Sequence, residues 1–143
     1  MEKVTKEREL KVITENRIGI LAEITGLIAE KGVNIEKFYA CVADEKAIFY
    51  LITNNNEKAK NALEGKGYQI EEKEVIVLLL WNRPGALSEV ATRFREKGIN
   101  LQFVYGTSSP DGVSTTVVFS SDDDSKALEA CESMILKEAE ERI

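Results

Sequence analysis

Histidine is absent from this 143-residue chain, and cysteine occurs only twice. Without histidine, general acid–base catalysis would fall to carboxylates or lysines, and the chain carries no nucleophile motif of the hydrolase or β-lactamase kind. Two distant cysteines without histidine do not make an ordinary zinc site. We therefore expect a protein that is not an enzyme and that holds no metal and no cofactor.

Long apolar segments are also missing. No apolar run approaches the roughly 20 residues needed to span a bilayer, and the stretch from Met1 to Glu9 has no apolar signal-peptide core. The formal net charge of −6 is spread over both halves and offers no cluster of Lys and Arg for nucleic acid or anionic membrane. We interpret the two cysteines as reduced packing residues. These absences predict a cytoplasmic protein with no nucleic-acid or membrane partner.

What the chain does contain is an internal repeat with a constant offset. The segment Asn16–Leu21 reappears as Asn82–Leu87, and Lys31–Ile35 reappears as Lys97–Leu101. Both pairs lie 66 positions apart (82 − 16 and 97 − 31). Segments that align without a gap from one loop to the next indicate a duplicated supersecondary unit. Two packed copies would also share an apolar interface, which a lone unit of about 70 residues lacks.

The periodicity within one copy predicts the order β-α-β-β-α-β. Three signals define the elements: alternation of apolar and polar residues, helical spacing of apolar residues, and a high content of β-branched residues. In chain order they indicate a strand at Leu10–Thr14, a helix from Ile20, strands at Ile35–Val42 and Ala47–Thr53, a helix at Glu57–Glu64 and a short strand at Tyr68–Glu71. This is the ferredoxin-like split βαβ arrangement, with both helices on one face of an antiparallel sheet. We predict an α+β fold with two such units in tandem, over residues 1–72 and 73–143.

The second copy ends differently from the first. Val75–Trp81 is apolar throughout, which predicts a central strand. From Ser125 to Ile143 no glycine or proline interrupts the chain, which predicts one long helix and no final strand; the alternative is a degraded strand near Met134–Lys137. A missing strand leaves an unpaired sheet edge. We therefore expect a homodimer, with this helix contributing to its contacts.

With this element order, the loop Asn-Arg-Ile/Pro-Gly-x-Leu after the first strand, and Lys-Gly-Val/Ile-Asn-Ile/Leu before the second, the chain resembles the ACT domain family. It resembles most closely the small proteins made of two ACT domains in tandem. The resemblance runs from about Arg8 to Met134. It implies a regulatory module that binds an amino acid or similar small effector where the sheets of two domains join side by side, and that passes the signal to an enzyme partner.

The resemblance also implies which residues bind the ligand. In the serine-sensing ACT domains of phosphoglycerate dehydrogenases, the ligand is held by a loop Asn, by the backbone of that loop and by the Asn that opens the second strand. The matching positions are Asn16, Gly19 and Asn34 in the first copy, and Asn82, Gly85 and Asn100 in the second. That subfamily carries a histidine two positions before the loop Asn, where this chain has Thr14 and Leu80. The identity of the ligand therefore stays open.

Elementary chemistry supports the same residues. Asn offers an acceptor oxygen and two N–H donors, so a pair of Asn side chains can read both the ammonium and the carboxylate of an amino acid. The loop Asn16–Gly19 opens a helix, and the free N–H groups of a helix N-terminus favour a carboxylate. Glycine lets a ligand approach the backbone closely.

Structural interpretations of these residues remain open. Asn16 and Asn82 are suited to cap their helices, Asn34 and Asn100 to support a turn, and the loop glycines to form tight turns. Asp122-Asp123-Asp124 lies where a helix should start, which suits the helix dipole. Two functions follow from these alternatives. The chain is either an effector-binding regulator or a ligand-silent assembly module whose sheets serve oligomerisation.

Overall fold

The computed structural model describes residues 1–142 and divides into two compact units. The first unit is Arg8–Glu74, and the second unit is Met1–Glu7 together with the chain from Val75 on. The elements are β1 (Lys3–Glu15), α1 (Ile20–Glu30), β2 (Ile35–Ala43), β3 (Lys46–Thr53), α2 (Asn56–Leu63), β4 (Gln69–Trp81), α3 (Ala86–Glu96), β5 (Leu101–Ser108), β6 (Ser114–Ser121) and α4 (Asp124–Glu141). These units differ from the expected domains 1–72 and 73–143, chiefly because residues 1–7 belong with the second copy.

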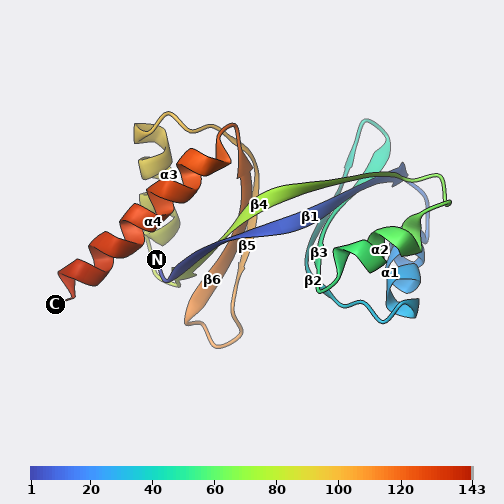
Figure 1. Ribbon diagram of the computed structural model, residues 1–143, viewed down its shortest axis with the longest axis horizontal. Coiled ribbons are helices and arrows are strands. Elements are labelled where there is room, and N and C mark those ends of the chain that lie inside the picture. Colours follow the sequence, from blue (N-terminus) through green and yellow to red (C-terminus); the bar gives the residue numbers. More distant parts are fainter. Residues whose placement is uncertain (143) are drawn as a thin grey trace. The chain divides into compact units, whose positions relative to one another are not determined.

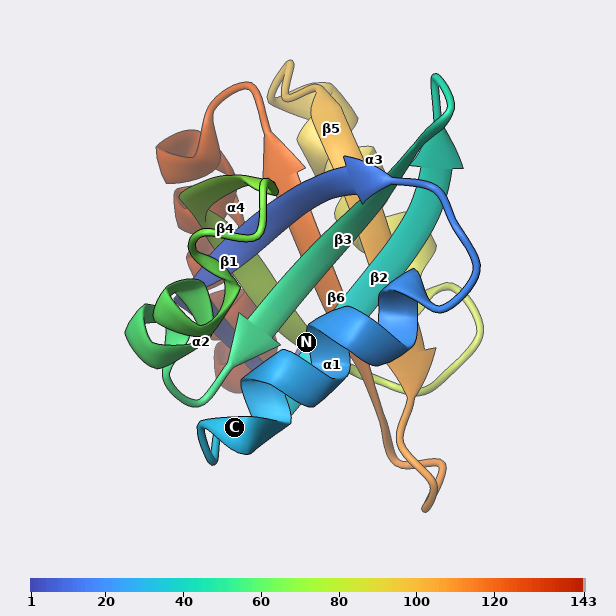
Figure 2. The same ribbon diagram turned by 90° about the vertical axis from the view of Figure 1, so that its right-hand side faces the viewer.

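The first unit has the strand order β2-β3-β1-β4, with β3 antiparallel to both β2 and β1. Helices α1 and α2 lie on one face of this sheet (Figure 2). The core lies between them, where Ile24 and Ile28 of α1 pack with Val12 of β1 and Phe49 of β3. The predicted β-α-β-β-α-β order and ferredoxin-like fold are confirmed here.

The second unit repeats the arrangement with the order β1-β4-β6-β5, and α3 and α4 lie on one side of its strands (Figure 1). Leu78 and Leu80 of β4 pack with Val90 and Phe94 of α3 and with Phe119 of β6. β4 lies between β1 and β6, so the expected central position of this apolar strand is confirmed. Among the described residues, no helix is both long enough and apolar enough to cross a membrane.

No strand follows α4 in the described chain, and Met134–Lys137 lies within that helix. The predicted long helix is therefore confirmed, and the alternative of a degraded strand is wrong. Residues 3–7 of β1 occupy the vacant place beside β4. The Glu2 N–H donates to the Leu79 carbonyl at 2.8 Å, and the ammonium group of Met1 lies 2.5 Å from Glu138 of α4.

The expectation of an open edge on the second sheet is wrong for this reason. Unpaired N–H and C=O groups along a strand favour any segment that can pair with them, and the beginning of this chain supplies one. The side chain of Met1 adds to the pairing because it is only 6 % exposed and packs in the core with Ile76, Leu78 and Leu80. A missing strand therefore gives no argument for a dimer.

The helix starts also differ from one interpretation of the sequence. The N-cap residues of α1 and α3 are Gly19 and Gly85, with no side-chain cap. Asn16 and Asn82 therefore do not cap these helices, because the helices begin too far along the chain. Side-chain caps occur instead at α2 and α4, where Asn55 accepts from the Lys58 N–H and Asp123 from the Lys126 N–H.

Candidate functional site

The loops before α1 and α3 share one backbone conformation. Gly19 has φ +87° and Gly85 has φ +86°, in the left-handed region that favours glycine. Nothing lies within 4 Å of the place where a β-carbon would stand at either glycine. The two glycines are thus required by the turn, and they also leave the surface above it open.

An ion pair connects each loop to the helix that follows it. Arg17 lies 2.6 Å from Glu23, and Arg83 lies 2.8 Å from Glu89. The repetition of Arg and Glu in both copies is explained by this contact. A ligand carboxylate would have to compete with a carboxylate already in place, so neither arginine is a free anion site.

The first loop carries one further contact. The Tyr68 hydroxyl donates to Glu23, beside the guanidinium of Arg17. This hydrogen bond, followed by that from Arg17, lowers the pKa of Glu23, while burial and the same hydrogen bond raise the pKa of Tyr68 to about 12. In the second loop the hydrogen bond from Arg83 lowers the pKa of Glu89.

The two loop asparagines differ in what they contact. Asn16 is exposed, and its side chain makes no hydrogen bond within residues 1–142. Asn82 donates from Nδ2 to the Gly112 carbonyl at 2.9 Å, and its Oδ1 accepts from Ser108 and Thr115 at 3.4 and 3.3 Å. The side chain of Asn82 is therefore occupied by the chain itself.

A longer turn in the second copy accounts for this difference. The helices α1 and α3 begin 66 residues apart (86 − 20), whereas β3 and β6 begin 68 apart (114 − 46). Two additional residues between β5 and β6 bring Gly112 within reach of the loop. In the first copy the shorter turn, Asp44-Glu45, makes no such contact.

Asn34 and Asn100 lie in turns that other residues hold. The backbone N–H of Asn34 donates to Oδ1 of Asn54 at 2.9 Å, and that of Asn100 donates to Oδ1 of Asp122 at 3.0 Å. The side chains of Asn34 and Asn100 are exposed and make no hydrogen bond in the described part of the chain. Their turns are thus formed through the backbone, and both amide groups remain available.

Sequence reasoning missed Asn54 and the turn-forming role of Asp122, although a signal for both exists. Asn54-Asn55-Asn56 and Asp122-Asp123-Asp124 hold the same three turn positions at an offset of 68. A search restricted to the offset of 66 cannot find them. The Asp triplet also does more than complement a helix dipole, since Asp124 accepts from Ser121 as Asn56 accepts from Thr53.

The structure does not bring the paired asparagines of one unit together. Asn16 follows Glu15, the last residue of β1. Glu15 and Ala43, the last residue of β2, both pair with Lys46 of β3, so Asn16 lies near the level at which β2 ends. Asn34 precedes Ile35 at the start of β2, which pairs with Thr53. Seven residues of β3 separate the two levels, about 23 Å at roughly 3.3 Å per residue. One unit alone therefore does not place both amides on one small ligand.

A family model described as an ACT domain pair matches residues 5–141. The chain belongs to the ACT domain family. ACT domains are regulatory modules and are typically not catalytic. The predicted family is thus confirmed over almost the whole chain.

Solved structures share the fold of this ACT pair. A protein of Bacteroides thetaiotaomicron superposes with a TM-score of 0.84 at 21 % identity, covering 92 % of this chain and 90 % of that one. The ligand-free regulatory subunit of aspartate kinase from Thermus thermophilus gives 0.67 at 14 % identity, covering 92 % and 96 %. The corresponding subunit from Thermus flavus gives 0.63 at 14 %, covering 92 % and 94 %. No curated protein sequence matches the chain.

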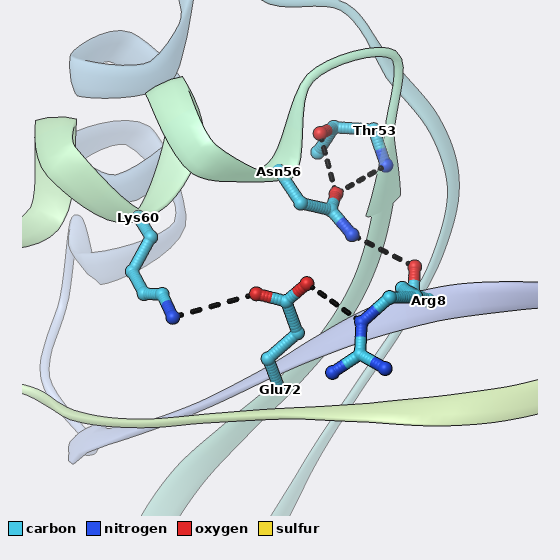
Figure 3. Close-up of polar contacts among 5 residues, drawn as sticks. All are labelled: Arg8, Thr53, Asn56, Lys60 and Glu72. Atoms are coloured by element: carbon cyan, nitrogen blue, oxygen red, sulfur yellow. Dashed lines mark hydrogen bonds and ion pairs between the residues drawn. The ribbon is translucent and has the colours of Figure 1, made fainter.

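A polar network in the first ACT unit ties its last strand to its first strand and to α2 (Figure 3). Glu72 of β4 pairs with Arg8 Nε at 2.9 Å and with Lys60 Nζ at 3.4 Å. Asn56 donates to the Arg8 carbonyl at 2.8 Å and accepts from the Thr53 hydroxyl at 2.6 Å. The hydrogen bond from Arg8 lowers the pKa of Glu72. Every charge in this network has a partner, so its role is to hold the unit together.

Apolar side chains are exposed along the outer strand of the first ACT unit. Phe38 pairs with Leu51, whose side chain lies in the core beneath α1, so Phe38 and Val42 share the helix-covered face. They are nevertheless 64 % and 59 % exposed, because β2 is the edge strand of the unit. Ile18, at the tip of the first loop, is fully exposed. This edge therefore presents apolar surface along a strand that pairs, among the described residues, with β3 alone.

Proposed function

We propose that this ACT pair is a regulatory protein that binds a free amino acid or a similar small effector between two copies of the chain. One observation carries the proposal. Asn16 and Asn34 have exposed amide groups without hydrogen bonds in the described chain. Asn34 precedes the edge strand β2, whereas Asn16 follows β1, two strands further in, at the level where β2 ends.

A symmetric pairing of edges would bring these two residues together across the contact. When β2 of one copy pairs antiparallel with β2 of a second copy, the start of each strand lies beside the end of the other. Asn16 of one copy then approaches the level of Asn34 of the partner subunit. A two-fold axis makes two identical sites per dimer, which is the usual closed form of a homodimer.

The exposed surface supports such a dimer. Phe38 and Val42 are large apolar side chains exposed on this edge strand, and Ile18 is exposed in the loop before α1. An uncovered edge strand readily pairs with another chain. A dimer contact at β2 would bury these apolar side chains and would also cover the exposed edge of the strand. The homodimer expected from the sequence thus has a different physical basis, at β2 rather than beside β4.

The chemistry of the shared site suits an α-amino acid. The carboxylate would meet the N–H groups that open α1 above Gly19, and the amides of Asn16 and the partner's Asn34 would read the ammonium and carboxylate groups. A hydrogen bond to a charged group contributes about 1.5–3 kcal/mol. Two or three of them, less the cost of immobilising the ligand, correspond to micromolar to millimolar affinity, about −8 to −4 kcal/mol.

We place this site in the first unit rather than the second. Asn16 is free, whereas the amide of Asn82 is already bound to Gly112, Ser108 and Thr115. A ligand at the second loop would first have to displace these contacts. Asn82, Gly85 and Asn100 therefore form the structural counterpart of the site, and binding is expected at one site per chain.

The signal would pass to an enzyme partner. The similar fold of aspartate kinase regulatory subunits supports a separate regulatory subunit that acts on a catalytic chain. Both cysteines are free thiols, in keeping with the reduced cytoplasm expected from the sequence.

Thermal melting with each of the twenty amino acids at 10 mM tests the proposal. Binding to the folded state raises stability by about 2.7 kcal/mol at a hundredfold excess over Kd, a shift of roughly 5–10 °C for a chain of this size. Asn16→Ala and Asn34→Ala should reduce the shift, and the matched controls Asn82→Ala and Asn100→Ala should keep it. If no amino acid moves the melting curve, the ligand-silent assembly module replaces this function.

Mixing the two variants tests the shared site directly. A dimer of one Asn16→Ala chain and one Asn34→Ala chain contains one intact site and one doubly altered site. After random exchange of subunits, about half of the dimers are mixed, so calorimetry should recover a quarter of the wild-type sites. Each variant alone contains only altered sites and should bind much more weakly than wild type. Recovery of no binding on mixing would contradict a site shared across β2.

A further inference from the structure

The second unit contains a groove that the proposed effector site does not use. It runs between α3 and α4, which contact each other on one side of the strands (Figure 1), and has a volume of about 740 Å³. Ser88 and Thr92 of α3 and Ser133 and Lys137 of α4 line it, at helical spacings of four. The first unit has no counterpart to the distal part of α4, because α2 ends after 8 residues and α4 continues for 18. The groove is therefore a feature of the second unit alone.

One residue that lines this groove carries a buried hydrogen-bond donor. Trp81, the last residue of β4, contributes to its lining. Its indole Nε1 is buried and has no hydrogen-bond partner within residues 1–142. Buried N–H groups are almost always satisfied in folded proteins. The indole N–H thus lacks an acceptor that a ligand oxygen would supply.

Two cations also line this groove. The guanidinium carbon of Arg142 lies 5.4 Å from the centroid of the Trp81 ring. Lys137 also lines the groove, and within residues 1–142 neither cation makes an ion pair.

The other charges of the groove are mostly neutralised. Arg83 pairs with Glu89, and Arg93 pairs with Glu96 at 3.3 Å. Glu138 forms an ion pair with the ammonium group of Met1. Of the lining carboxylates, Glu141 alone has no ion pair in the described chain, so two uncompensated cations face one uncompensated carboxylate.

We infer that this groove is a second binding site, for a small oxyanion with several carboxylate or phosphate oxygens. Lys137 and Arg142 supply the charge, and the Trp81 indole N–H donates a hydrogen bond to one ligand oxygen. The planar guanidinium group binds carboxylate and phosphate groups through two parallel hydrogen bonds, and Arg142 already lies against the indole. The site differs from the proposed effector site in position and in ligand charge, so either can exist without the other.

The fluorescence of Trp81 reports on this site directly, because it is the only tryptophan of the chain. We would titrate succinate, citrate, inorganic phosphate and pyrophosphate at constant ionic strength, with sodium chloride as the reference. A saturable change in emission with citrate or succinate identifies carboxylate as the ligand chemistry, and one with phosphate or pyrophosphate identifies phosphate. If all four titrations follow the sodium chloride curve up to 20 mM (a range that covers affinities down to the millimolar level), the inference is wrong.

Variants locate the binding, with calorimetry as the readout because Arg142 itself affects the indole. Lys137→Gln combined with Arg142→Gln should weaken binding at least tenfold, and Trp81→Phe should weaken it severalfold. Lys126→Gln, an exposed α4 residue outside the groove, should bind as wild type does. Equal affinity in the double variant and wild type would overturn the assignment. Asn16→Ala should leave oxyanion binding unchanged, which separates this site from the effector site.

Discussion

At the residue scale, short polar side chains at turns satisfy backbone groups that would otherwise be orphaned. Asn55 and Asp123 cap α2 and α4, and Asn54 and Asp122 hold the turns before β2 and β5. Asn16, in contrast, makes no such bond in the described chain. Residues of one chemical type therefore divide into those that the fold uses and those that it leaves free.

Alanine at the caps should separate these two classes. Asn55→Ala and Asp123→Ala should each lower the free energy of unfolding by about 1 kcal/mol, because a helix-terminal N–H loses its acceptor. Asn16→Ala should stay within about 0.5 kcal/mol of wild type, as surface changes without such a role do. Urea unfolding at pH 7 measures all three. A loss at Asn16 as large as at Asn55 would contradict the assigned helix starts.

The Glu72 network should make stability depend on pH. The pKa of Glu72 is lowered below the ordinary 4.5, chiefly by the hydrogen bond from Arg8. The network therefore stabilises the fold fully above about pH 4.5, and this stabilisation is lost as the pH falls through the lowered pKa of Glu72. Glu72→Gln should therefore unfold about 1 kcal/mol more easily than wild type at pH 7, with solvent screening taken into account. That difference should shrink as the pH falls below about 4.5 and disappear once Glu72 is protonated in the folded state.

Urea unfolding at pH 7, 5, 4 and 3 follows this difference. Glu30→Gln, at an exposed carboxylate without an ion pair in the described residues, is the matched control and should show no comparable loss at pH 7. A gap between Glu72→Gln and wild type that stays constant down to pH 3 would exclude the ion pair as its cause.

At the scale of elements, β1 and β4 each contribute to both units. Residues 8–15 of β1 and 69–74 of β4 belong to the first unit, and residues 3–7 and 75–81 belong to the second. The long α4 takes the place in sequence where a last strand would stand. The second sheet is completed from the other end of the chain because edge pairing depends on unsatisfied main-chain groups and not on sequence proximity.

Val4→Asp should destabilise the second unit selectively. Val4 is half-buried against the core of that unit, and a carboxylate there would lose hydration without gaining a partner, at roughly 1–3 kcal/mol. Hydrogen exchange should speed up in β4 from Val75 on and in α4, more than in α1. The exposed neighbour Lys3 provides the control, since Lys3→Asp should change little. Equal acceleration in α1 and α4 would count against residues 3–7 as part of the second unit.

At the scale of the whole molecule, the two copies are similar in fold but unequal in autonomy. The first unit is one continuous segment that contains all of its strands, whereas the second needs a strand that precedes the first. The two expected domains are therefore not interchangeable building blocks. Cutting the chain at the boundary of the repeat should expose this difference.

A fragment of residues 8–74 should fold alone, with the marginal stability of a domain of that size. Residues 75–143 alone should not fold cooperatively, because the apolar strand Val75–Trp81 loses its neighbour and becomes an open edge. Joining residues 1–7 behind residue 143 through a short glycine-serine linker should restore folding. A short linker suffices because the Met1 ammonium lies 2.5 Å from Glu138. Circular dichroism melts decide between these outcomes, and cooperative unfolding of 75–143 without the added strand would contradict the prediction.

The sequence by itself determined the features that depend on local patterns. The duplication, the order of strands and helices and the absence of a strand after α4 follow from spacing and periodicity within short windows. The ACT family was indicated by a resemblance in the loop motifs of both copies. These features are confirmed. They could be predicted because each copy repeats the same pattern of apolar residues, glycines and turns. The roles of Gly19 and Gly85 as turn residues follow from the same local logic.

Only the tertiary structure decided which distant segments meet. No local signal shows that residues 3–7 pair beside β4, because the sequence of a strand does not specify which other strand it pairs with. The separation of Asn16 from Asn34 results from the strand order, and the engagement of Asn82 results from a turn two residues longer. Both depend on long-range register, which sets whether a polar residue is left free for a ligand or used by the fold.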